Sequence, residues 1–193
     1  MLTALIDYES GNLHSALKAF EKISSENSLG SVAVTNDPEI ISNADRLVLP
    51  GDGAFPACKV ALEKSEVFEA LKHAVLAKRR PFLGICVGMQ LMAKKGFEFE
   101  PTNGLNWING QVERIQLDDP SLKIPHMGWN EIAIDYDHAI LKDIKNGDHF
   151  YFVHSYQMRV FNHEERLAHV DYGGDITAIA VSYTHLRAHE TCT

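Results

Sequence analysis

One cysteine, Cys86, stands in a sequence context that suits nucleophilic chemistry. It follows the apolar run Phe82 to Ile85, which is of strand length, and it precedes a helical pattern from about Gly88 to Lys94. A nucleophile on a sharp strand-to-helix turn needs small residues two positions before and two after it, because larger side chains would collide there. Gly84 and Gly88 occupy both positions. The pattern predicts a nucleophile elbow, with the thiolate stabilised by the N-terminus of the following helix.

Backbone amides close to Cys86 are expected to stabilise an oxyanion. The Val87 amide opens the helix that follows the cysteine and is positioned to donate to a developing negative charge. The turn Pro50 to Phe55 follows another predicted strand, so in a parallel sheet it lies at the same edge as the elbow. The amides of Gly51 and Gly53 can approach a substrate closely, because neither residue has a side chain.

Each of these features also has a purely structural interpretation. Cys86 could be a small buried hydrophobic residue, and Pro50 to Phe55 could be an ordinary Asp-Gly turn. Among the ten histidines, His126 and His154 are the two most suited to a role in a site. His154 ends an apolar strand, where a lone histidine is more often packed and hydrogen-bonded than catalytic. Cys58 and Cys192 have no comparable context.

Composition narrows the class of protein. The 193 residues carry a net charge of −8, and 45% of them are hydrophobic, which favours one globular domain. The sequence has no block of basic residues that would indicate a nucleic-acid partner. No apolar run is long enough to span a membrane, and the first ten residues do not have the pattern of a signal peptide. We therefore expect a cytoplasmic protein that binds small molecules or another protein. The three cysteines form no CxxC pair, and no HExxH or phosphate-binding loop occurs, so no metal or cofactor is expected.

Strands and helices alternate in the first half of the chain, which predicts an α/β fold with a parallel sheet covered by helices on both faces. The second half reads as short strands separated by Gly, Asn and Asp turns. We expect strands at 2–6, 31–35, 46–49, 82–85, 97–99, 107–115, 130–134, 150–153, 166–170 and 176–181. We expect helices from Asn12, from Asp37 to about Asn43, around 67–75, at 88–94 and near 139–144.

The motifs together resemble a known family. The stretches Asp7 to Ser15, Pro50 to Phe55, Gly84 to Gln90, Pro125 to Asn130 and Tyr151 to Tyr156 occur in the order and spacing of the glutaminase subunits of imidazole glycerol phosphate synthase. These are class I glutamine amidotransferases of histidine biosynthesis. The resemblance implies a flavodoxin-like α/β fold with a parallel or mixed sheet. It also implies hydrolysis of L-glutamine through a cysteinyl thioester, with ammonia passed to a partner cyclase, a (β/α)₈ barrel, in a heterodimer.

The resemblance also implies roles for individual residues. Cys86 corresponds to the nucleophile, and the oxyanion positions are Gly51, Gly53 and Val87. The glutamine-contacting positions are Gln90, His154, Ser155 and Tyr156. The positions that face the cyclase are Asn12, Ser15, Met127, Trp129 and Tyr151. Asp52 stands where the family has a small apolar residue, a change that a loop working through its backbone should tolerate.

The sequence departs from the family pattern after Val181. The family places its catalytic base and the acid that orients it on a His-Pro-Glu-Lys-Ser motif, and residues 182–193 contain no such motif. His189 is followed directly by Glu190, and adjacent residues of a strand point to opposite faces. We therefore expect an amidotransferase domain over residues 1–181 and an aberrant tail over 182–193, and we expect the chain as written to be inactive because the histidine and glutamate of the triad are missing. The alternatives are a catalytically inactive subunit or fragment that binds the cyclase, and a class I glutaminase that serves another acceptor.

Overall fold

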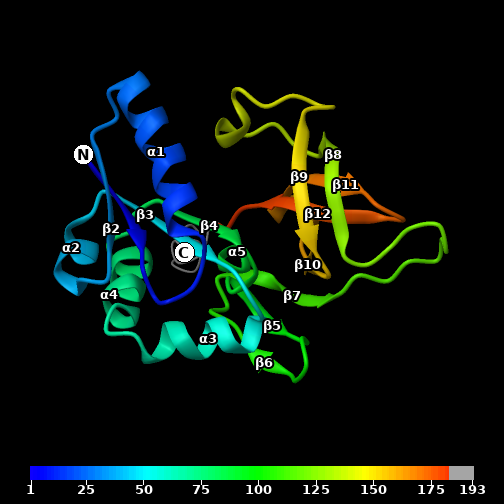
Figure 1. Cartoon of the computed structure of the whole chain (residues 1–193), viewed down its shortest axis with the longest axis horizontal. Helices are drawn as coiled ribbons and strands as arrows, with labels where there is room; N and C mark the ends of the chain where they lie inside the picture. The colour runs from blue at the N-terminus through cyan, green and yellow to red at the C-terminus, as the bar shows by residue number, and fades with distance from the viewer. Residues whose placement is uncertain (183–193) are drawn as a thin grey trace, which may run out of the picture. The chain divides into compact units, whose positions relative to one another are not determined.

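The computed structural model describes residues 1–182, which fall into two compact units. The first unit, Met1–Met92, contains a parallel sheet in the order β2-β1-β3-β4 (Figure 1). Its strands are β1 (Leu2–Ile6), β2 (Ser31–Thr35), β3 (Arg46–Gly51) and β4 (Phe82–Cys86). Its helices are α1 (Leu13–Asn27), α2 (Pro38–Asn43), α3 (Phe55–Lys64), α4 (Phe68–Lys72), the π-helical turn η1 (His73–Ala77) and α5 (Val87–Gln90).

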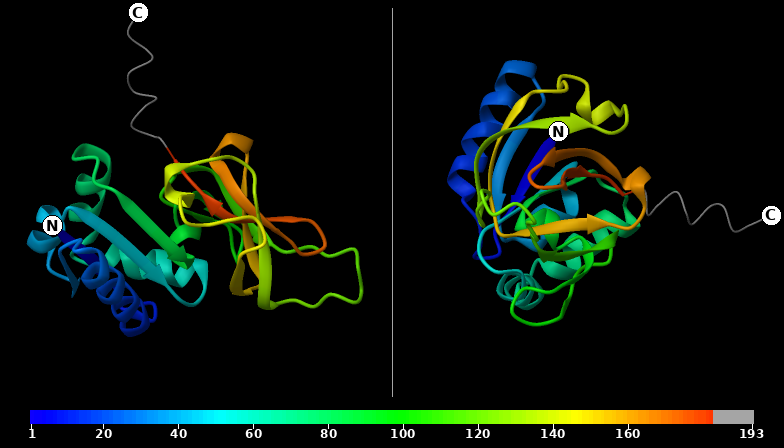
Figure 2. Two further views of the ribbon diagram at one scale, coloured as in Figure 1. Left: turned by 90° about the horizontal axis from the view of Figure 1, so that it is seen from above. Right: turned by 90° about the vertical axis from the view of Figure 1, so that its right-hand side faces the viewer.

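The sequence explains where the first helices begin. Asn12 caps α1 by accepting a hydrogen bond from the Ser15 amide at 3.1 Å, and Asp37 caps α2 in the same way, with Pro38 at the first helical position. Right-handed crossovers between parallel strands place α1 on one face of the sheet and α2 and α4 on the other. Figure 2 shows this arrangement. The prediction of a parallel sheet with helices on both faces is therefore confirmed.

The apolar strands supply the core of the first unit. Residues of β1 and β3 such as Leu5, Leu47 and Leu49 are at most 1% exposed, because helices cover both faces of these central strands. β4 lies at the end of the sheet order and is more open, with Leu83 and Ile85 about two-fifths exposed. The carboxyl ends of β3 and β4 lie side by side, since Gly51 pairs with Cys86.

The second unit, which begins at Ala93, consists mainly of antiparallel strands in two sheets. One sheet has the order β10-β7-β5-β6, with β5 (Ala93–Gly96), β6 (Thr102–Asn103), β7 (Ile108–Arg114) and β10 (Tyr156–Val160). The other has the order β12-β11-β8-β9, with β8 (His126–Ile134), β9 (His149–His154), β11 (Arg166–Asp171) and β12 (Asp175–Ala180). Two short 3₁₀ turns are η2 (Ala139–Leu141) and η3 (His163–Glu165).

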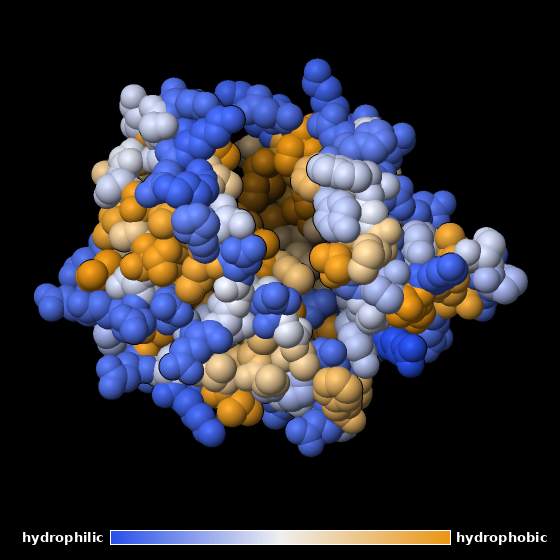
Figure 3. All heavy atoms as spheres, viewed as in Figure 1, coloured by the Kyte–Doolittle hydropathy of each residue, from blue (hydrophilic) through white to orange (hydrophobic). Residues whose placement is uncertain are grey.

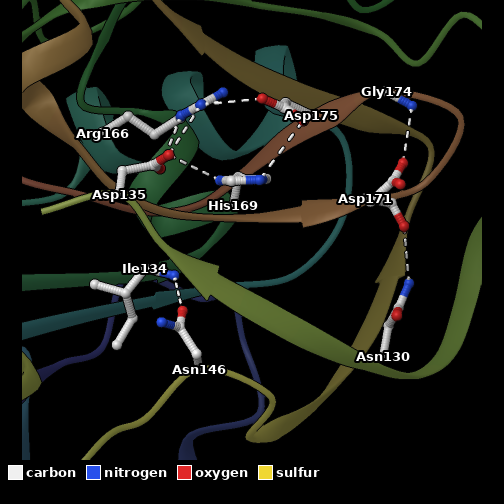
Figure 4. Close-up of polar contacts among 9 residues, drawn as sticks. All are labelled: Asn130, Ile134, Asp135, Asn146, Arg166, His169, Asp171, Gly174 and Asp175. Carbon is white, nitrogen blue, oxygen red and sulfur yellow. Dashed lines mark hydrogen bonds and ion pairs between the residues drawn. The ribbon is translucent and has the colours of Figure 1, made fainter.

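A charged cluster ties β8, β11 and β12 together (Figure 4). Asp135, directly after β8, accepts two hydrogen bonds from the Arg166 guanidinium at 3.0 and 3.1 Å and contacts His169 Nδ1 at 2.9 Å. Arg166 also binds Asp175 at 3.1 Å. Desolvation lowers the pKa of Arg166, but the hydrogen bonds and charge of Asp135 outweigh it and the net shift is upward. The cluster therefore joins three neighbouring strands of the sheet.

Three predicted elements are wrong. The helix predicted at 88–94 ends at Gln90, because Ala93–Gly96 pairs with β7 as strand β5. Residues 97–99, predicted as a strand, have no regular structure, and the preceding residues Ala93–Gly96 form strand β5 instead. The helix predicted near 139–144 is only the 3₁₀ turn η2. The helix α3 and the strand β10 were not predicted from the sequence.

Candidate functional site

Cys86 has the backbone of a nucleophile elbow. Its φ of 55° and ψ of −118° lie in a strained region for a residue with a side chain, at the junction between β4 and α5. A Cβ added to Gly84 would lie 2.6 Å from the Gly88 carbonyl oxygen, and one added to Gly88 would collide with the Leu49 carbonyl oxygen. Both glycines are therefore required by close backbone contacts, as the sequence pattern predicts for such a turn.

Cys86 is an exposed residue, which contradicts its interpretation as a buried hydrophobic residue. Desolvation by the surrounding protein raises the pKa of the Cys86 thiol, and the hydrogen bond from the Val87 backbone lowers it by less. The charges of Asp52 and Cys58 raise it further, so the net shift is upward. The Val87 amide at the N-terminus of α5 favours the thiolate, in the direction that the sequence predicts, but desolvation outweighs this effect. This helix has only one turn.

The predicted oxyanion residues lie beside the elbow. Gly51 is paired with Cys86, and a Cβ on Gly51 would approach the Gly88 amide nitrogen to 2.7 Å and the Tyr8 hydroxyl to 2.8 Å. Gly53 has a φ of +114°, which a residue with a side chain rarely adopts. Tyr8 is buried and its hydroxyl lies close to Gly51, a contact that the sequence did not reveal.

Ser10 and Cys58 make hydrogen bonds to the backbone of Asp52, the residue between Gly51 and Gly53. The Ser10 hydroxyl donates to the Asp52 carbonyl at 2.8 Å and accepts from the Asp52 amide at 3.2 Å. The buried Cys58 thiol lies 3.3 Å from Ser10 Oγ and donates to the Asp52 carbonyl at 3.4 Å. The Asp52 amide is therefore engaged by Ser10. Only the position of Ser10 within the Asp7 to Ser15 motif could have pointed to this contact.

Other predicted site residues lie in both units. In the first, Gln90 is 7% exposed at the end of α5, and Asn12 and Ser15 interact with each other at the start of α1. In the second, the predicted partner-facing side chains are exposed on the β8–β9 pair. The exposed fractions are 61% for Met127, 71% for Trp129 and 54% for Tyr151. Trp129 and Tyr151 are paired in register, and their rings meet edge to face at 5.6 Å.

The segment His154 to Tyr156 forms the junction between β9 and β10. His154 Nδ1 lies 3.0 Å from the Tyr156 carbonyl oxygen, and His154 Nε2 lies 3.1 Å from Nδ1 of His126. Desolvation lowers the pKa of His126 to about 4, and the nearby His154 contributes to this shift. Desolvation also lowers the pKa of His154, against the opposing effect of its bond to Tyr156.

Hydrophobic side chains reach the surface in several places among hydrophilic ones (Figure 3). No helix among residues 1–182 is long and apolar enough to cross a membrane. The same residues contain no group of three or more His, Cys, Asp or Glu that could hold a metal ion. The departure from the family pattern at His189 and Glu190 lies outside the described residues.

Comparison with known proteins identifies the family. The family model described as glutamine amidotransferase class-I matches residues 4–184. This chain belongs to the class I glutamine amidotransferases. A protein of Ruegeria pomeroyi named imidazole glycerol phosphate synthase subunit HisH is 58% identical over 180 residues, which cover 93% of this chain and 85% of the relative. A Cereibacter sphaeroides protein of the same name is 57% identical with the same coverage.

Solved structures support the fold. A crystal structure titled glutamine amidotransferase matches with a TM-score of 0.64 at 14% identity, covering 86% of this chain and 79% of the other. A glutamine amidotransferase from Thermotoga maritima matches with a TM-score of 0.57 at 16% identity, covering 90% of this chain and 72% of the other. The predicted fold class, an α/β class I amidotransferase, is confirmed, as is the resemblance on which it was based.

Proposed function

We propose that this chain is the glutaminase subunit of an imidazole glycerol phosphate synthase and uses Cys86 as its nucleophile. The observation that carries the proposal is the strained backbone of Cys86, an exposed residue between Gly84 and Gly88 at the end of β4. The names of the relatives support the choice of this member of the family.

In the proposed reaction, Cys86 Sγ attacks the side-chain carbonyl carbon of L-glutamine. The tetrahedral intermediate places its negative charge where the Val87 amide, and an amide of the Gly51 to Gly53 turn, can donate. The C–N bond then breaks, ammonia leaves with the proton that the thiol gave up, and a γ-glutamyl thioester remains. Water hydrolyses the thioester to glutamate. The contacts proposed for glutamine are Gln90, His154, Ser155 and Tyr156.

We propose that the ammonia serves a cyclase subunit that makes imidazole glycerol phosphate and aminoimidazole carboxamide ribotide in histidine biosynthesis. We propose that this heterodimer is cytoplasmic. The surface proposed for the cyclase includes Met127, Trp129 and Tyr151, since large exposed aromatic side chains on a regular strand pair are typical anchors of interfaces. Asn12 and Ser15 are proposed to belong to the surface that faces the cyclase as well.

One observation favours a second candidate, a subunit that binds the cyclase without hydrolysing glutamine. The pKa of Cys86 is raised, and both of the titratable groups that act on it among the described residues, Asp52 and Cys58, raise it. We propose that residues 1–181 are the amidotransferase domain and that the sequence from Ser182 onward does not supply the family's base. A polypeptide of residues 1–193 would then bind glutamine and the cyclase but release little ammonia.

Alkylation of cysteine tests the glutamine site directly. A chloroketone analogue of L-glutamine should label Cys86 faster than iodoacetamide does, and L-glutamine should protect Cys86 from both reagents. Cys58 is the internal control, because it is 3% exposed and should label slowly throughout. Labelling of Cys86 that glutamine does not slow would refute the proposed substrate.

Binding of the cyclase tests the proposed interface. Trp129→Ala should weaken binding to the cyclase subunit of Ruegeria pomeroyi by at least about tenfold, as expected for an aromatic anchor at an interface. Phe161→Ala is the control, because Phe161 is an aromatic residue of the second unit that is 52% exposed but lies outside β8 and β9. Equal affinities of the two variants would contradict the placement of the interface.

A further inference from the structure

The chain changes sheets at Ser155 without a connecting loop. β9 pairs with β8 in one sheet and β10 pairs with β7 in the other, and only Ser155 separates the two strands. The Ile115 amide donates to the Ser155 carbonyl at 3.0 Å. Such a corner needs further contacts to fix its backbone, because it belongs fully to neither ladder of hydrogen bonds.

His154 supplies one of these contacts, and the contact determines its tautomer. The Tyr156 carbonyl oxygen can only accept, so the proton of a neutral His154 lies on Nδ1. His154 Nε2 must then accept, and the Nδ1–H of His126, 3.1 Å away, donates to it. The donors thus run in one direction, from His126 through His154 to the backbone of Tyr156.

Two observations support neutral rings at neutral pH. Desolvation lowers the pKa of His126 to about 4 and also lowers the pKa of His154. The aromatic and imidazole rings next to His126 are those of Phe152, His154 and Tyr172, none of which carries a charge that would favour an imidazolium. The direction of the hydrogen bonds is therefore fixed over the physiological range.

His126 is itself held rigidly. It stands opposite His154 in the β8–β9 register and is 2% exposed. Its ring stacks on Tyr172, with centroids 3.9 Å apart, and on Phe152, with centroids 4.9 Å apart. The Tyr172 hydroxyl donates to the Lys123 carbonyl at 2.7 Å and accepts from the Lys123 amide. These two hydrogen bonds hold the Tyr172 ring against His126.

We propose that His126 is a positioning residue for the substrate: through His154 it holds the corner His154 to Tyr156 in the arrangement that contacts glutamine. The inference rests on the proposed assignment of this corner to glutamine binding. His126 does not touch the substrate itself. Its effect reaches the site through the two hydrogen bonds and the backbone that they hold.

Two amide variants separate positioning from simple packing. His126→Asn places a side-chain N–H where Nδ1 lies and keeps the donor to His154. His126→Gln places its amide near the position of Nε2 and loses that donor. Both variants lose the ring, so the stack with Phe152 and Tyr172 is disturbed in both. His149→Gln, at an exposed histidine that begins the neighbouring strand β9, is the control for the substitution itself.

The first readout is nuclear magnetic resonance of the ring nitrogens in the full chain. Long-range proton–nitrogen spectra at pH 7 should show His126 and His154 as neutral rings protonated on Nδ1. In His126→Gln, the Nε2 resonance of His154 should shift, because its lone pair has lost a donor. A His154 protonated on Nε2 in the unchanged protein would overturn the proposed direction of the hydrogen bonds.

The second readout is the rate at which the chloroketone analogue of glutamine alkylates Cys86, separated into the inactivation constant KI and the limiting rate. Loss of one net hydrogen bond predicts a KI raised about five- to tenfold in His126→Gln. His126→Asn and His149→Gln should stay within about twofold of the unchanged protein. The limiting rate and the labelling by iodoacetamide should not change in any variant, because the elbow is untouched.

The outcomes distinguish this inference from the proposed function. If glutamine protects Cys86 and KI is the same in His126→Gln as in His126→Asn, the positioning role is refuted while the function stands. If both variants raise KI equally, His126 acts through packing alone and the inference is also refuted. If glutamine fails to protect Cys86 in the unchanged protein, the proposed function is refuted and this role falls with it.

Discussion

Acid should destabilise the second unit through His126 in a way that can be calculated. The pKa of His126 is lowered from 6.5 to about 4 in the folded protein, so the unfolded chain binds a proton more readily. Stability is therefore fully present above pH 6.5 and is lost as the pH falls from 6.5 towards 4. With about 1.36 kcal/mol for each pKa unit, the loss from this residue between pH 7 and pH 5 is about 2 kcal/mol. The lowered pKa of His154 acts in the same direction.

Urea unfolding followed by tryptophan fluorescence measures this loss. Both tryptophans, Trp107 and Trp129, lie in the second unit, so the signal reports on the part of the chain that contains His126. The comparison is with His126→Asn, which does not titrate and keeps the donor to His154. The free energy of unfolding should fall by about 2 kcal/mol more in the unchanged protein than in this variant between pH 7 and pH 5. An equal fall in both would refute the claim that His126 is held neutral by its surroundings.

Four further predictions concern the elbow, its support, the charged cluster and activity. Gly88→Ala should lower the free energy of unfolding by more than about 3 kcal/mol in urea titrations, because its Cβ would collide with the Leu49 carbonyl oxygen; a loss below about 1 kcal/mol would contradict the tight turn. Ser10→Ala should cost about 1 kcal/mol in the same assay, since the Asp52 peptide loses both of its bonds to the hydroxyl; no change would mean that the two bonds add nothing. Asp135→Ala should lower the free energy of unfolding by about 2 kcal/mol, because Arg166 and His169 lose a shared partner in a mostly shielded site. The control Glu131→Ala breaks only the exposed contact with His149 and should change stability by less than about 0.5 kcal/mol. With the cyclase present, a polypeptide of residues 1–193 should release ammonia from glutamine at least about a thousandfold more slowly than the Ruegeria pomeroyi relative does, since the family's base is not found in its sequence; comparable rates in a coupled glutamate assay would disprove this.

The elbow could be predicted from the sequence because its requirements are local. Two glycines at fixed spacing from Cys86 indicate a turn in which side chains would collide, and the structure has those close contacts. The pKa of the thiol could not be predicted in the same way. It depends on how much protein surrounds the sulfur and on Asp52 and Cys58, which lie elsewhere in the sequence.

Strand pairing explains most of what the sequence did not reveal. The residues after Gln90 have a helical pattern, but the backbone of Ala93–Gly96 gains its hydrogen bonds from β7, and this pairing overrides the local preference. The contact between His126 and His154 likewise depends on a register between residues 28 positions apart. Sequence position marked both histidines as candidates, but only the pairing of β8 with β9 makes them a hydrogen-bonded pair.

Cys86 has the backbone of a nucleophile elbow, but the groups around it do not activate its thiol. The strained turn leaves Cys86 exposed and places the Val87 amide beside its thiol, whereas desolvation and the neighbouring acidic groups raise the thiol pKa. The Asp52 amide is engaged by the Ser10 hydroxyl, so it is not available to an oxyanion in this arrangement. A thiol with a raised pKa attacks an amide only when a base removes its proton as the bond forms. Among residues 1–92, none of the groups that act on the Cys86 thiol is a histidine.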